Sequence, residues 1–139
     1  MTVDTVAFLI GVVLAVVVGI FGSVVRLDRE RGFYPTIMIV IALLYGLFAA
    51  IGESVEALAQ EALPMLGFIL AAVLGFKRSL WIVVAALVGH GLFDAVHGQL
   101  IANPGVPGWW PAFCSAYDVV AGLYLAFLLR TGRVAARPG

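Results

Sequence analysis

The chain has 139 residues, of which 63% are hydrophobic and only 12% are charged. Soluble domains carry about a quarter charged residues, so this composition excludes an ordinary water-soluble protein and indicates an integral membrane protein. Eight basic and eight acidic residues leave no net charge to attract nucleic acid. A single cysteine cannot form an intrachain disulfide. The partner that this composition predicts is the lipid bilayer.

Five stretches of the chain are long enough and apolar enough to cross a membrane as helices. A membrane-spanning helix needs about 20 mostly apolar residues. The sequence therefore predicts an all-α polytopic bundle, one integral membrane domain over residues 1–139, with spans at 6–25, 34–52, 55–76, 79–102 and 111–129. A bundle of five helices this small is also suited to forming a homo-oligomer.

The third span allows two interpretations. The apolar run that begins at Pro64 gives only about 20 Å of helix, which is too short to cross a bilayer. A start at Val55 gives sufficient length, with Ser54 as the N-cap and Glu56 and Glu61 as solvated acids in the first turns. We therefore predict one helix, kinked near Pro64. The alternative is a short interfacial helix followed by a half-span.

All eight basic residues follow the first, third and fifth spans, at positions Arg26, Arg29, Arg31, Lys77, Arg78, Arg130, Arg133 and Arg137. Cytoplasmic loops of membrane proteins are enriched in Lys and Arg. This pattern predicts an N-terminus outside and a C-terminus in the cytoplasm. The 103–111 segment then lies outside; its three prolines and two tryptophans predict an interfacial anchor or a lid over an outward pocket.

Ionisable side chains inside spans are costly and point to function. The fourth span carries His90, Asp94 and His97, and the fifth carries Asp118. On a helix the first three occupy a stripe about 60° wide, and both aspartates lie about 10 Å from the outer ends of their helices. Spans joined by a short loop are antiparallel neighbours, so we expect the two aspartates to meet in an outward-facing pocket.

A metal ion is the first interpretation of this pocket. Two buried carboxylates need a compensating cation or proton, and no basic residue lies on this half of the chain. His90, Asp94, His97 and Asp118 are suitable ligands for zinc, or for iron or manganese with water. In a metal-dependent hydrolase both histidines and one aspartate would hold the ion. The other aspartate would activate water, so Asp94 and Asp118 are the candidate catalytic residues.

Other interpretations of the polar stripe remain open. The pocket could bind a small polar ligand, or belong to a cation- or proton-coupled transporter or channel. The polar pair could also only fix helix packing in an accessory subunit. The stripe becomes apolar towards the cytoplasm, through Leu87 and Val83, which argues against a simple pore.

Further side chains are expected to line the rim of the pocket or to hold its ligands in position. They are Glu53, Tyr45, Cys114, Ser115 and Tyr117. Glu53, Glu56 and Gln60 could rim the same outer opening. Gly89 and Gly91 flank His90 and would let a neighbouring backbone approach the site.

Three runs of the sequence resemble small multi-pass membrane proteins of bacteria. They are RGFYPT at 31–36, HGLFDAVH at 90–97 and NPGVPGWWPAFCSAYD at 103–118. The resemblance implies a location in a bacterial plasma membrane but does not imply any particular activity. The embedded His/Asp set is also similar to that of alkaline-ceramidase-like membrane hydrolases, which hold zinc with histidines and an aspartate. This second resemblance implies metal-dependent hydrolysis.

Overall fold

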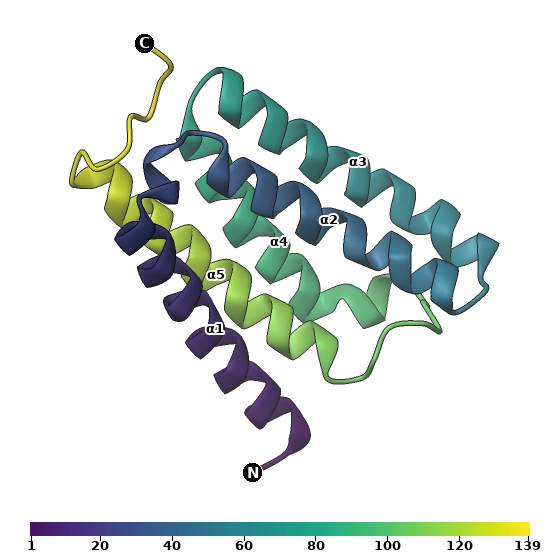
Figure 1. The fold of residues 1–139 in the computed structure, drawn as a ribbon. Helices are drawn as coiled ribbons and strands as arrows, with labels where there is room; N and C mark the ends of the chain where they lie inside the picture. The colour runs from purple at the N-terminus through teal and green to yellow at the C-terminus, as the bar shows by residue number, and fades with distance from the viewer.

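The computed structural model describes residues 1–139 as five long helices joined by short connections (Figure 1). Each is long enough and apolar enough to cross a membrane, which confirms the all-α prediction of five candidate spans. The helices are α1 (Val3–Val25), α2 (Phe33–Ile51), α3 (Val55–Lys77), α4 (Leu80–Leu100) and α5 (Trp110–Arg130), with a short 3-10 helix, η1 (Leu27–Arg29), after α1.

Helix α3 runs unbroken through Pro64. Ser54 caps its N-terminus, since the Ser54 hydroxyl accepts a hydrogen bond from the Ala57 amide at 3.1 Å. This cap fixes the start of the helix one residue later, at Val55. The prediction of one long helix is confirmed, and the alternative of a separate interfacial helix is wrong.

Helices α4 and α5 form an antiparallel pair in the middle of the bundle (Figure 1). Helix α1 packs along α5, while α2 and α3 pack against each other and against α4. Most of the apolar core lies between α2, α4 and α5. Its largest fully buried side chains are Met38, Leu80, Val83, Leu87, Leu125 and Leu128.

The close approach of α4 to α5 depends on Gly91. A Cβ atom at this position would lie 2.9 Å from the Ser115 carbonyl oxygen, which confirms that a neighbouring backbone packs beside His90. We expect Gly91→Ala to push the helices apart and to lower the free energy of unfolding by about 1–3 kcal/mol.

Gly98→Ala is a matched control, because Gly98 is on the same helix and a Cβ there would meet nothing within 4 Å. This second variant should be more stable than the parent by up to about 1 kcal/mol, because alanine is the better helix former. Thermal unfolding in detergent compares the two variants. Equal melting temperatures would contradict the tight packing at Gly91.

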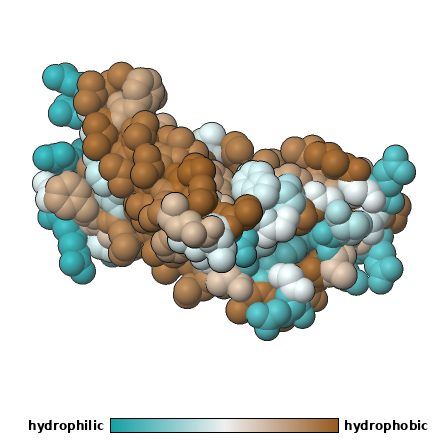
Figure 2. All heavy atoms as spheres, turned by 90° about the horizontal axis from the view of Figure 1, so that it is seen from below, coloured by the Kyte–Doolittle hydropathy of each residue, from teal (hydrophilic) through white to brown (hydrophobic).

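The three basic segments of the chain, which follow α1, α3 and α5, gather at one end of the bundle, called here the basic end. The Arg31 guanidinium donates hydrogen bonds to the carbonyl oxygens of Phe76, at 2.7 Å, and Ala135. The Leu80 amide donates to the Ala136 carbonyl at 2.8 Å. The opposite end, called here the loop end, carries the 101–109 connection. Figure 2 shows a broad hydrophobic area between hydrophilic atoms at the two sides of the view.

Candidate metal centre

Successive turns of α4 carry His90, Asp94 and His97 into the interior of the bundle. Each of these side chains, and Asp118 on α5, is at most 2% exposed. His90 lies near the middle of α4, about 15 Å from the end of that helix, and Asp94 lies one turn nearer the loop end. Small residues let α5 come close enough to place Asp118 beside His90.

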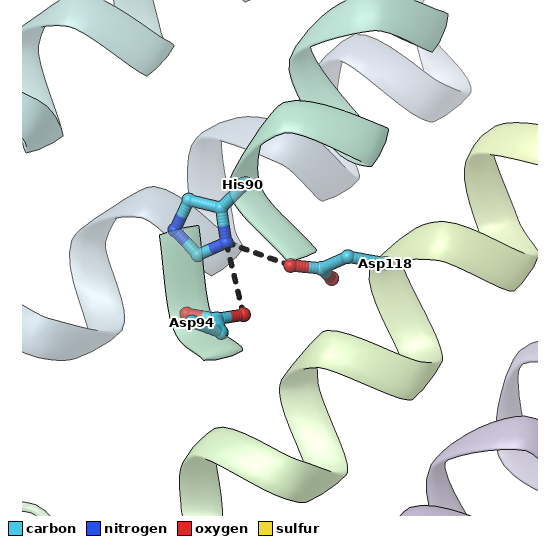
Figure 3. A group of neighbouring side chains, drawn as sticks. All are labelled: His90, Asp94 and Asp118. Carbon is cyan, nitrogen blue, oxygen red and sulfur yellow. Dashed lines mark hydrogen bonds and ion pairs between the residues drawn. The ribbon is translucent and has the colours of Figure 1, made fainter. Parts of the chain in front are cut away.

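His90 lies between the two aspartates (Figure 3). Its Nδ1 atom is 2.7 Å from Asp118 Oδ2 and 3.3 Å from Asp94 Oδ2. One potential ligand atom from each of the three residues lies within 4.8 Å of the other two. The structure therefore brings Asp94 and Asp118 together with one histidine, in a group that could hold a metal ion.

The charges of this group balance only with a further cation or with a proton on one of the carboxylates. Asp118 Oδ1 is buried and has no hydrogen-bond partner, and Asp94 Oδ2 has only its longer contact to His90. Every Lys and Arg of the chain lies in the segments at the basic end. Two ionised carboxylates beside at most one positive imidazole leave at least one uncompensated negative charge, which is expensive inside a protein.

Tyr45 of α2 holds Asp94 from its other side. The Tyr45 hydroxyl donates a hydrogen bond to Asp94 Oδ1 at 2.7 Å. Asp94 Oδ2 is thereby directed towards His90 and Asp118. Tyr45 therefore lies beside one of the candidate ligands, where it would orient Asp94 towards a bound ion.

The other predicted rim residues lie outside the hydrogen-bond network of the cluster. Glu53 is exposed in the turn between α2 and α3, with φ of 52°. The Cys114 and Tyr117 side chains line an apolar groove between α1, α2 and α5. Ser115 contributes its backbone carbonyl to the contact with Gly91. None of these four side chains hydrogen-bonds to His90, Asp94 or Asp118.

His97 does not join the other three predicted ligands. It lies two turns from His90, about 10 Å further along α4. Its Nε2 atom is 2.7 Å from Glu61 Oε1 on α3, and its ring stacks on the Tyr45 ring with centroids 3.9 Å apart. The sequence predicted that His97 acts together with Asp94, because the two residues share a face of α4. In the structure the partner of His97 is instead Glu61 of α3.

Glu61 was expected in solvent, and this prediction is wrong. The Glu61 side chain is only 1% exposed, because the start of α3 packs its inner face into the bundle. The Asn103 amide, from the connection after α4, donates to Glu61 Oε1 at 2.9 Å and to the Tyr45 carbonyl at 3.0 Å. Glu61 lies on the same face of the helix as Ala57 and Ala72, which are both buried. This shared face with small apolar residues is the sequence pattern that could have indicated the burial of Glu61.

None of the larger pockets in this structure is lined by His90, Asp94 or Asp118, so the expected outward pocket does not reach the cluster. The cavity beside the cluster has a volume of about 10 Å³, which is about the space needed to hold one water molecule. Its lining residues include His90, Tyr45 and Glu61. Towards the basic end, the Val83, Leu87 and Leu125 side chains are fully buried in apolar packing. The polar stripe of α4 therefore stops halfway along that helix.

Fold and site together define a class: a small protein of five candidate membrane-spanning helices with a buried histidine–carboxylate group in one half. No protein-family model matches the sequence, and no curated protein or solved structure matches it either.

Proposed function

We propose that this chain is a metal-binding protein of the bacterial plasma membrane, which holds a divalent ion, zinc in the first place, with His90, Asp94 and Asp118. The observation that supports this most strongly is the pair of buried carboxylates with unused oxygens on either side of one imidazole. A divalent cation would compensate their charge. One nitrogen and several oxygen ligands suit zinc, iron or manganese.

Metal-assisted hydrolysis is the chemistry that such an ion would supply. Three protein ligands leave a coordination position for water, and a bound divalent ion makes that water a better nucleophile. Asp118 would hold the ion with the oxygen that now contacts His90, and Asp118 Oδ1, which has no partner, could then take the proton of that water. The cavity of about 10 Å³ admits water but no larger substrate, so hydrolysis would require the bundle to open.

The two rival functions fit the geometry less well. A channel or transporter needs a polar route to both sides, while the basic-end half of α4 and α5 is closed by leucine and valine. An accessory subunit with a purely structural polar pair gives no reason for the two carboxylate oxygens that have no hydrogen-bond partner.

Metal content tests the proposal. Wild-type protein, purified in mild detergent from zinc-supplemented cells, is expected to carry about one zinc per chain by elemental analysis. Asp118→Asn should carry almost none. Asp28→Asn is the control, because Asp28 is also a buried carboxylate but pairs with Ser23 near the basic end. Wild-type protein without metal, or loss of metal in both variants, would contradict the proposal.

We also propose that the basic end faces the cytoplasm, with the N-terminus outside. All eight basic residues lie at that end, and membrane proteins keep such residues inside. A reporter that is active only in the cytoplasm, fused after Gly139, should give signal. A silent fusion, together with an active periplasmic reporter at the same position, would contradict this orientation.

A further inference from the structure

Glu61, His97 and Asn103 form a second polar group, called here the outer cluster, between the metal site and the loop end. Glu61 Oε1 is 2.7 Å from His97 Nε2 and accepts a hydrogen bond from Asn103 Nδ2 at 2.9 Å. Glu61 and His97 are buried at 1% and 2% exposed. The metal site proposed above uses none of these residues, although burying them is costly.

The outer cluster adjoins the metal site in two ways. The Tyr45 ring stacks on His97, while the Tyr45 hydroxyl donates to Asp94. The cavity of about 10 Å³ is lined by Glu61 from the outer cluster and by His90 from the metal site. An ion leaving the metal site through this cavity would therefore meet Glu61 next.

Apolar side chains block two other directions for a cation. The fully buried Leu80, Val83, Leu87, Leu125 and Leu128 pack between α4 and α5 in the half of the bundle towards the basic end. The sides of the bundle are apolar surfaces that suit lipid, in which a divalent ion is not soluble. The loop end remains as the direction from which a cation could reach the metal site, and the outer cluster lies between that end and the site.

The 101–109 connection covers the outer cluster and is held to α2. Asn103 donates to the Tyr45 carbonyl as well as to Glu61. Gly105 packs directly on the backbone at the end of α2, where a Cβ atom at Gly105 would collide with the Phe48 carbonyl. The Trp110 ring packs against the Phe48 ring, with centroids 4.8 Å apart. These contacts close the route without any covalent tie.

We propose that the outer cluster is the entry gate of the metal site. A divalent cation enters at the loop end, meets the Glu61 carboxylate and the His97 imidazole, and passes through the cavity to His90, Asp94 and Asp118. Asn103 is the latch, because its two hydrogen bonds hold the connection over Glu61. This inference rests on the proposed metal site, and it assigns the ligand's route to residues outside that site.

Cation exchange rates test the latch on the intact protein. Apo protein in detergent is mixed with Co²⁺, and metal uptake and release to a chelator are followed by absorbance. Asn103→Ala should accelerate both uptake and release by about tenfold, the worth of one to two hydrogen bonds, while the bound amount stays at the wild-type level. Val106→Ala, in the same connection and without a polar side chain, is the control. Unchanged rates in Asn103→Ala would overturn the gate.

A second measurement does not depend on metal binding. Ala42 lines the cavity and is 2% exposed, so Ala42→Cys in a Cys114→Ser background reports access from the loop end. A small, positively charged thiol reagent should label this cysteine about tenfold faster when Asn103→Ala is added. Val83→Cys should stay unlabelled in both backgrounds. Equal labelling of Ala42→Cys with and without Asn103→Ala would overturn the gate, whereas metal-free wild-type protein would overturn the proposed function.

Discussion

His90→Gln is expected to abolish both metal binding and the stabilisation of the fold by added zinc. His90 is the one nitrogen donor of the group and contacts both aspartates through Nδ1. A ligand that binds only the folded state stabilises it by about 4 kcal/mol at a thousandfold excess over its dissociation constant. Wild-type protein should therefore melt at a clearly higher temperature with zinc than with a chelator, and His90→Gln should not.

His97→Gln is the control for this experiment. His97 contacts Glu61 and not the proposed ligands. This variant should be less stable than wild type in the absence of metal, yet zinc should still raise its melting temperature. Loss of the zinc effect in His97→Gln but not in His90→Gln would show that the wrong histidine has been chosen.

Glu61→Ala is expected to lower the free energy of unfolding by about 1–3 kcal/mol, the usual cost of leaving buried polar partners unpaired. The substitution removes the hydrogen-bond partner of His97 Nε2 and one of the two acceptors of the Asn103 amide. Glu56→Ala, one to two turns earlier on the same helix, removes an exposed carboxylate and should change stability by less than about 0.5 kcal/mol.

Thermal unfolding of these two variants in the same detergent measures the difference. Equal stability of Glu61→Ala and Glu56→Ala would contradict the burial of Glu61. Glu61→Gln adds a further check, because an amide oxygen can still accept from Asn103, so this variant should recover part of the loss.

The helices could be predicted almost completely from the sequence, because each is a long apolar run bounded by polar residues or prolines. The start of α3 is an example. Ser54 offers a cap and Val55 begins a run that is long enough to span, so local chemistry alone favours one helix through Pro64. The packing of α1 on α5 could not be predicted from the sequence, because α1 is apolar on all its faces and its residues do not indicate which helix it contacts.

The candidate site was only partly predictable. The spacing of His90 and Asp94 puts them on one face of α4, and the short connection to α5 brings Asp118 opposite. The partner of His97 depends on how α3 packs against α4, which spacing along one helix does not determine. Asn103 lies in an irregular segment whose path follows from contacts with α2 and α3.

X-ray absorption spectroscopy of the zinc-loaded protein tests the metal site most directly, because it reports the number and kind of the ligand atoms. The spectrum should show one imidazole, from His90, and oxygen ligands from Asp94, Asp118 and water at about 2.0–2.2 Å. Scattering from two imidazoles would place His97 at the ion, and scattering from sulfur would place Cys114 there. Either result, or the absence of bound zinc, would contradict a centre built from His90, Asp94 and Asp118.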